Sequence, residues 1–310
     1  MGGLDRSVTA GCPRTICDVI PQIALVSCDP LLPEGDSGDA PLSAALVNRG
    51  YQVEVASWSD SAVNWQRFDL TVLRSTWDYT LRQADFLSWL PTVPRLHNPA
   101  TVVAANSDKR YLGLLVDAGL PVVETAFSAP GTVLELPSSG QFVIKPAVGA
   151  GSRGAGRFDA DQPGELDRAV DHAARLHALG RTVMVQPYLH AVDSEGETAM
   201  IYFDGKFSHA IGKGRMLEPG AGYEAEGSSL WLAENISPRT PSAAEHAAAD
   251  RIIGYLSPSE PLLYARIDLL PTAAGPVLLE AELAEPSLFF DHHPGSAEVM
   301  AAAIARRIGA

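Results

Sequence analysis

Cysteine, basic charge and long apolar runs are all scarce in this 310-residue sequence, and each shortage excludes a class of protein. The three cysteines, Cys12, Cys17 and Cys28, match no zinc-ligand spacing, and an odd number cannot make a disulfide framework. A reducing cytoplasm is the compartment that fits such a sequence. No apolar run approaches the length that spans a membrane, so we expect no membrane partner.

Acidic residues outnumber basic ones by 37 to 23, which gives a net charge of −14 at neutral pH. This balance argues against a nucleic-acid partner, because nucleic acids require a basic face. It also means that a polyphosphate ligand would need local cations or a metal ion. The apolar content of 46% is ordinary for a globular protein, so we expect a sizeable core.

We expect residues 1–21 to form a disordered tail. They show no periodic pattern, and they lack the basic segment and apolar core that would mark a secretory signal. Residues 22–97 then alternate strand-like and helix-like segments, which predicts a parallel sheet flanked by helices.

Polar residues follow the third predicted strand of this sheet, where parallel sheets bind ligands beyond the carboxyl ends of their strands. Arg74 and Ser75 lie there, and the forked guanidinium of Arg74 is suited to binding the carboxylate of a substrate. The alternative is a salt bridge of Arg74 with Asp78 or Asp29.

Two segments in the middle of the chain indicate an anion site. Ser107 is predicted to cap a helix over 108–119, with Lys109 in its first turn. The helix dipole disfavours a lysine there, so a bound anion would explain it, and a solvated lysine is the alternative. A second lysine, Lys145, follows the strand predicted from the segment GQFVI, just before a glycine-rich loop.

The glycine-rich loop, residues 149–156, has backbone N–H groups that can approach phosphates closely. It contains the pattern G-x-G-x-x-G, which alone is a weak sign of dinucleotide binding. Lys145-Pro146 separates the strand from the glycines, and no long apolar helix follows, so we reject that interpretation. The sequence instead predicts a flap over phosphates, with a flexible surface hairpin as the alternative.

Further along, residues 164–180 predict an amphipathic helix whose histidines, His172 and His177, are five apart and are expected to be solvated. A strand then ends at 186–189, where main-chain groups could bind a base edge. A hairpin follows, turning at 204–205, and we expect residues 214–240 to form a loop.

The last strong pattern is a predicted hairpin over 262–283. Its first strand carries Arg266 and Asp268, and its second carries Glu280 and Glu282. Side chains two apart on a strand share a face, so the hairpin would gather three carboxylates and one guanidinium. Oxygen ligands of this kind suit Mg²⁺. The alternatives are a solvated charged face and an arginine–carboxylate salt bridge.

Seven short segments occur in order between residue 98 and the end of the chain: NSDK, FVIKP with the glycine loop, VQPYL, GET, HAIGK, ARID and LLEAEL. Together they resemble the ATP-grasp superfamily of carboxylate–amine ligases, of the glutathione synthetase and ribosomal protein S6 modification type. The resemblance implies an α/β ATP-grasp fold with a Rossmann-like pre-ATP-grasp domain at 22–97, a small lid domain at 98–189 and a catalytic α+β domain at 190–310.

The resemblance also implies roles for single residues. It implies a nucleotide-binding set: Lys109, Lys145, Gly149, Gly151, Ser152, Arg153, Gly154, Gln186, Pro187, Tyr188, Leu189 and Glu197. It implies that Asp268, Glu280 and Glu282 hold Mg²⁺ or Mn²⁺, and that Arg266 and Lys213 are catalytic. Glu282 departs from the family pattern, which commonly has asparagine there, and adds a charge at the metal site.

The implied activity is an ATP-dependent ligation, in which a carboxylate becomes an acyl phosphate and an amine then attacks it. The segments RSTW, DKRYL, VDSEGET and ELAEPSL further resemble the ring-closing ligases of D-cycloserine formation. A small amino-acid-like substrate is therefore expected, and the oligomeric state is left open. The alternatives are a ligase that extends a peptide or protein tail and a non-catalytic nucleotide-binding protein. A nicotinamide oxidoreductase would rest on the glycine pattern alone.

Overall fold

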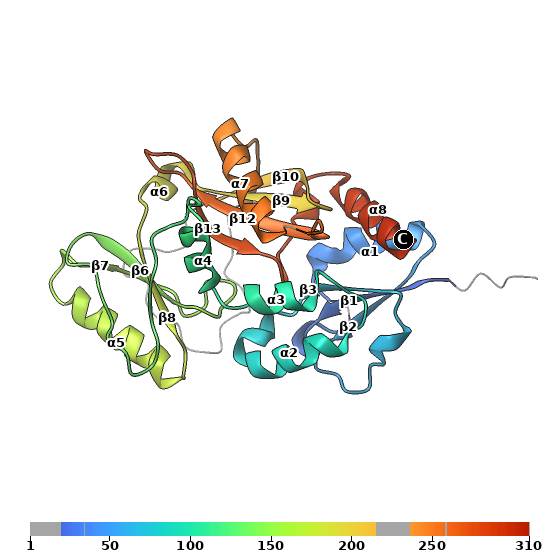
Figure 1. The fold of residues 1–310 in the computed structure, drawn as a ribbon, viewed down its shortest axis with the longest axis horizontal. Helices are drawn as coiled ribbons and strands as arrows, with labels where there is room; N and C mark the ends of the chain where they lie inside the picture. Colours follow the sequence, from blue (N-terminus) through green and yellow to red (C-terminus); the bar gives the residue numbers. More distant parts are fainter. Residues whose placement is uncertain (1–19, 34, 215–235, 258, 310) are drawn as a thin grey trace, which may run out of the picture.

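A computed structural model describes residues 20–309 apart from 34, 215–235 and 258 (Figure 1). Most of the predicted tail and most of the predicted loop at 214–240 therefore lie outside the described residues. The predicted α/β class is confirmed, because three sheets succeed one another along the chain, each with its own helices. Within the described ranges, no helix combines the length and the apolar character needed to cross a membrane.

The first sheet is parallel, as predicted, with the strand order β2-β1-β3-β4. Its elements are β1 (Gln22–Ser27), α1 (Ala40–Asn48), β2 (Gln52–Ser57), β3 (Leu70–Ser75), α2 (Gln83–Trp89) and β4 (Leu96–His97). Alternate residues of β1 pack on opposite faces: Ile23 belongs to the core that contains Leu42 of α1, and Ala24 to the core that contains Phe86 of α2. Burial on both faces explains why β1 is a continuous apolar run.

Two short helices, α3 (Ala100–Asn106) and α4 (Tyr111–Asp117), correct the helix expected over 108–119. Ser107 ends α3 and donates its hydroxyl to Ala104 O at 2.9 Å, so it caps no following helix. Lys109 lies in the link between the two helices, not in a first turn. Its backbone N–H donates to Ala147 O at 2.9 Å, which fastens this link to the start of the glycine-rich loop.

The second sheet is antiparallel, has the order β5-β8-β6-β7, and is covered by one long helix at the far end of the molecule (Figure 1). Its elements are β5 (Ala126–Ser128), β6 (Gln141–Pro146), β7 (Gly156–Asp159), α5 (Glu165–Ala178) and β8 (Val183–Pro187). The expectation that His172 and His177 are solvated is wrong for His172, which is 1% exposed. His172 faces Gly154 O through Nε2 at 2.9 Å, and His177 faces Ser128 O at 3.0 Å, because both lie on the side of α5 that packs on the sheet.

The third sheet is also antiparallel, with the order β11-β10-β9-β12-β13, and both predicted hairpins lie in it. Its elements are α6 (Ala191–Glu195), β9 (Glu197–Phe203), β10 (Lys206–Lys213), β11 (Ile236–Arg239), α7 (Ala243–Leu256), β12 (Tyr264–Leu270), β13 (Val277–Glu282) and α8 (Ser296–Ile308). Helix α8 lies beside α1, and its Met300 shares a core with Leu46 of α1 and Ile201 of β9. Helix α8 therefore packs in a core that is shared by the first and the third sheet.

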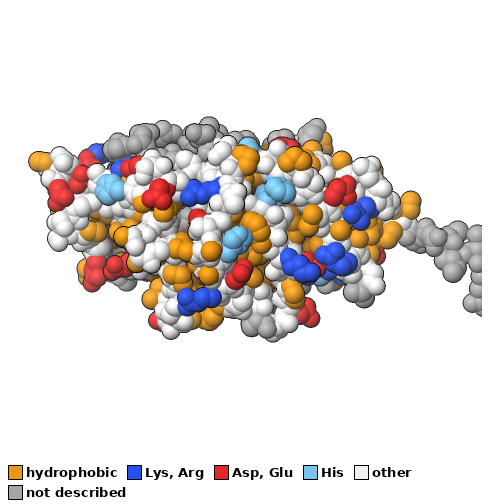
Figure 2. Space-filling view, turned by 90° about the horizontal axis from the view of Figure 1, so that it is seen from above, with side chains coloured by type: hydrophobic (Ala, Val, Ile, Leu, Met, Phe, Trp, Pro, Cys, Tyr) orange, Lys and Arg blue, Asp and Glu red, His pale blue; other side chains and the backbone are white. Residues whose placement is uncertain are grey.

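The described acidic and basic side chains are interspersed on the face seen from above (Figure 2). The net negative charge is therefore not gathered into one patch among the described residues of this face. A group of charged side chains on the third sheet, including Asp268 and Arg266, is buried instead.

Candidate active site

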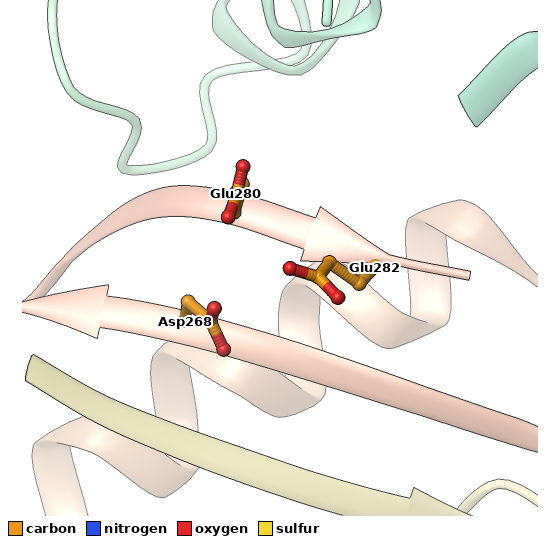
Figure 3. A group of neighbouring side chains, drawn as sticks. All are labelled: Asp268, Glu280 and Glu282. Carbon is orange, nitrogen blue, oxygen red and sulfur yellow. The ribbon is translucent and has the colours of Figure 1, made fainter. Parts of the chain in front are cut away.

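Three carboxylates meet on the third sheet, where β12 and β13 pair. The antiparallel register sets Asp268 opposite Glu280 and Arg266 opposite Glu282. One oxygen from each of Asp268, Glu280 and Glu282 lies within 4.8 Å of the others, and Figure 3 shows the three side chains converging. The hairpin pattern read from the sequence therefore does bring these carboxylates together.

Arginine and lysine side chains pair with these carboxylates. Arg266 donates to Asp268 at 2.8 Å and contacts Glu282. Lys213 lies 2.9 Å from Asp268 and 2.7 Å from Glu197, its cross-strand neighbour. Most of these groups are buried, so their charges interact in a medium that screens them poorly. The salt bridge expected as an alternative for Arg266 is present within the same cluster.

The two lysines predicted from separate segments converge on Glu280. Lys109 Nζ lies 3.3 Å from Glu280 and donates to Gly149 O at 2.8 Å. Burial pushes the pKa of Glu280 upward, but Lys109 and Lys145 outweigh it and hold that pKa well below its usual range. Burial lowers the pKa of Lys145 against the pull of Glu280. An anionic ligand beside Lys145 would offset the cost of burying its ammonium.

Glu282 behaves differently from its neighbour. Burial raises its pKa to about 8, because Arg266 compensates only part of the cost and Glu280 and Asp268 repel a further negative charge. A divalent cation among the three carboxylates would favour the charged form of Glu282. The all-oxygen donor set fits a hard cation such as Mg²⁺ or Mn²⁺.

The glycine-rich loop covers this cluster and is anchored at both sides. Gly154 has φ +72°, and a Cβ there would lie 3.3 Å from Pro146 and 3.4 Å from Leu176, so a larger residue would be both strained and crowded. Gly151 and Ser152 also adopt positive φ, at 61° and 58°. Arg153 donates to Thr80 Oγ1 at 2.7 Å and so fastens the loop to the 3-10 helix Trp77–Leu81, which follows β3.

The predicted base-binding segment ends β8. Gln186 is buried and donates to Thr125 Oγ1 at 2.9 Å, while the neighbouring Pro187 is exposed and Leu189 half-buried. Tyr188 donates its hydroxyl to Asp193 at 2.6 Å and lies under the Arg157 guanidinium. These side chains bond within the protein, and the backbone N–H of Tyr188 donates to Gln141 O at 2.8 Å. Base binding by the main chain of this segment stays a prediction.

Glu197, which the family resemblance connects with the ribose hydroxyls, lies at the start of β9. Burial raises its pKa to about 7, with Lys213 acting in the opposite direction and Asp268 adding to the rise. It therefore belongs to the same charge network as Asp268 and Glu280.

Arg74 is buried and pairs with none of the three carboxylates of the hairpin. It is 2% exposed, and its guanidinium pairs with Asp39 at 2.9 Å instead of with Asp78 or Asp29. It also donates to Pro286 O at 3.0 Å, in the loop that follows β13. Ser75 donates its hydroxyl to Ser27 at 2.8 Å. The substrate role of Arg74 and Ser75 stays a prediction.

The sequence patterns missed residues that hold the outer edge of β13. Tyr111 hydroxyl accepts from Ala281 N at 2.7 Å and donates to Ala281 O at 3.0 Å. Asn106 donates to Ala281 O and accepts from Leu283 N, both at 2.8 Å. A strand at the edge of a sheet has unpaired backbone groups, and these two side chains pair them. Glu280 and Glu282 flank Ala281 and are positioned by this arrangement.

Comparison with known proteins now gives the family. Residues 23–98 match the family model described as D-cycloserine synthetase DcsG, N-terminal domain. The chain is 37% identical over 283 residues, 86% of its own length and 93% of the relative's, to the cycloserine biosynthesis protein DcsG of Streptomyces lavendulae.

Solved structures agree with these relatives. A crystal structure of D-cycloserine synthetase DcsG matches with a TM-score of 0.82 and 34% identity, over 93% of this chain and 99% of that one. D-alanine–D-alanine ligase of Bacillus anthracis complexed with ATP matches in fold, with a TM-score of 0.62 and 14% identity over 93% of this chain and 97% of that one. A RimK domain protein of the ATP-grasp type from Sphaerobacter thermophilus matches with a TM-score of 0.62 and 16% identity, over 91% of this chain and 98% of that one.

The relatives above 30% identity do not favour the alternatives of a peptide-tail ligase or a non-catalytic protein. The fold is the ATP-grasp fold that the resemblance implied. The lysines, the carboxylates and the glycine-rich loop come together on it. The chain belongs to the D-cycloserine synthetase DcsG family, and it is an ATP-dependent ATP-grasp ligase that forms a carbon–nitrogen bond.

Proposed function

We propose that this ligase forms the ring of D-cycloserine by joining the carboxylate and the aminooxy nitrogen of one small amino acid of the O-amino-D-serine type. The identity of 37% over nearly the whole of a cycloserine biosynthesis protein supports this substrate more than any other observation. In the ring, one carbon–nitrogen bond joins the former carboxyl carbon to the nitrogen of an alkoxyamine.

The reaction has two steps. A carboxylate oxygen attacks the γ-phosphorus of ATP, and ADP leaves, which gives an acyl phosphate. The aminooxy nitrogen then attacks the carbonyl carbon, loses a proton, and inorganic phosphate leaves. Because both groups are in one molecule, the second step gains an effective molarity of about 10⁵ M or more. An alkoxyamine is a weak base and is neutral near pH 7, so its nitrogen is a nucleophile without a strong general base.

The residues of the cluster have different roles in these two steps. Lys109 and Lys145 bind the phosphates, while Arg266 and Lys213 stabilise the negative charge that develops as the acyl phosphate forms and breaks down. Asp268, Glu280 and Glu282 hold Mg²⁺ or Mn²⁺, which when bound supplies positive charge beside the phosphate oxygens. The main chain at 186–189 binds adenine, and Glu197 binds the ribose hydroxyls.

The glycine-rich loop has a protective role. An acyl phosphate is hydrolysed when water reaches it, so the site must stay closed between the two steps. The bond from Arg153 to Thr80 supports closure, because it joins the loop to the segment that follows β3. The chain divides into domains after residues 97 and 189. The protein works in a reducing cytoplasm.

The test is an assay of the purified protein with ATP, Mg²⁺ and O-amino-D-serine, measuring ADP, phosphate and ring product. We expect one ADP and one phosphate for each ring formed, with no product when ATP is omitted. ATP consumption that never yields the ring, with a panel of other amino acids turned over instead, would overturn the assignment of substrate while leaving the ligase chemistry intact.

A further inference from the structure

Side chains from distant parts of the sequence bond to the backbone of the loop that follows β13, residues 283–288. Every backbone carbonyl from Leu283 to Leu288 accepts a hydrogen bond from a side chain outside this loop. The donors are, in order along the loop, Asn98, Tyr264, Trp77, Arg74, Arg266 and His209. A segment fixed in this way can present a side chain in one position without help from that side chain's own contacts.

The side chain presented is Glu285, the one carboxylate of this loop. It is 8% exposed and lines a narrow pocket of about 30 Å³ together with Tyr79, Lys109 and Glu280. That volume suits one small polar group. Ala150 of the glycine-rich loop also lines the pocket, so the pocket lies under the flap and next to the metal-site carboxylates.

Charge pairing sets Glu285 apart from its neighbours in the pocket. Glu280 pairs with Lys109, and Glu282 pairs with Arg266. Among the described residues, Glu285 forms no ion pair, although Lys109 lines the same pocket. A buried carboxylate without a direct ion pair is costly, and a cationic ligand group beside it would offset that cost.

The substrate of the proposed reaction carries such a group. Ring closure consumes the carboxylate and the aminooxy nitrogen, but the α-amine remains free in substrate and product. That amine is a stronger base than the alkoxyamine and is an ammonium at neutral pH.

We propose that Glu285 is the specificity residue that binds the α-ammonium of the substrate. The proposal rests on the proposed function, because it takes an amino acid as the substrate. Arg74 acts in it as a positioning residue, since it holds the carbonyl of Pro286 next to Glu285 and makes no contact of its own with the ammonium.

The experiment compares Glu285→Gln with the unmodified enzyme on two substrates: O-amino-D-serine and 3-(aminooxy)propanoic acid, which lacks the α-amine. In the unmodified enzyme, kcat/KM should be far higher for the amino acid. In Glu285→Gln it should fall about 10- to 150-fold for the amino acid, as expected on losing a charge-assisted hydrogen bond, and change little for the analogue. The KM for ATP should stay the same.

Controls separate binding from folding. Glu298→Gln makes the same chemical change in an exposed pair with Arg49 and should leave both substrates unaffected. Glu285→Asp should restore part of the discrimination, which a purely structural role would not do. If Glu285→Gln lowers activity on both substrates equally, or on neither, the inference is overturned. If the unmodified enzyme cyclises neither substrate, the proposed function fails first; calorimetry with D-cycloserine then tests Glu285 alone, and equal affinity in both proteins overturns it.

Discussion

Replacing Arg74 by alanine tests the link between the first sheet and the loop after β13. The guanidinium is 2% exposed, pairs with Asp39 at 2.9 Å and donates to Pro286 O at 3.0 Å. Removing one partner of a buried pair leaves the other charge uncompensated and typically costs about 3–5 kcal/mol. We expect Arg74→Ala to lose about that much stability at neutral pH, and to raise the KM for the amino-acid substrate because the loop that carries Glu285 loosens.

The pH dependence of this loss has a definite sign. Burial raises the pKa of Asp39 above its ordinary value, and Arg74 opposes the rise. Without Arg74, the folded-state pKa of Asp39 rises further above the unfolded-state value. An acid with a raised folded pKa costs stability once it ionises, so the deficit should be full at pH 8 and shrink as the pH falls toward the ordinary pKa of aspartate.

The assay is chemical denaturation at pH 5 and pH 8, together with steady-state kinetics for both substrates. Arg49→Ala, which breaks an exposed pair with Glu298, is the matched control and should cost about 1 kcal/mol or less. Stability of Arg74→Ala equal to that of the control would refute the buried-pair reasoning. An unchanged KM for the amino acid, in a variant that is clearly less stable, would refute the coupling between Arg74 and the substrate.

Three further predictions address the nucleotide half of the site. Lys145→Ala should weaken ATP binding about 10- to 150-fold in calorimetry, since a buried ammonium is lost; ATP affinity equal to that of the unmodified protein would remove Lys145 from the site. Glu280→Gln should abolish Mg²⁺-dependent turnover. The circular dichroism spectrum should stay unchanged, because the Glu280 side chain is partly exposed and is not part of the apolar core. Normal activity of this variant would contradict the metal role. Arg153→Ala should release more phosphate per ring formed, because the flap loses its bond to Thr80 and water reaches the acyl phosphate; a ratio that stays at one means that this contact does not control closure.

Local patterns were enough to predict the parts of the site that lie on regular strands. The alternation in the hairpin at 262–283 placed Asp268, Glu280 and Glu282 on one face, because a strand fixes the direction of every second side chain. Lys145 was found from its position between a predicted strand and the glycine-rich loop. These predictions needed only contacts between residues that are close in sequence or paired across one turn.

The failures involve bonds between distant segments. Ser107 matches a helix cap in sequence, yet its hydroxyl bonds back to Ala104 and the next helix begins later. The partner of Arg74 is Asp39, which precedes a helix thirty-five positions earlier, and no local pattern selects it over Asp29. Glu285 lies in an irregular loop where no periodicity assigns a direction to a side chain.

The series of carbonyl contacts at residues 283–288 also has a consequence for enzyme engineering. The path of this loop is dictated by donors on other segments, so its own side chains can be exchanged without moving its backbone. A library that varies Glu285 and the residues beside it, with all six donors kept, would therefore sample new amine specificities on one unchanged scaffold. Substitution of the donors would instead remove the hydrogen bonds that fix the loop, and the resulting variants would be inactive.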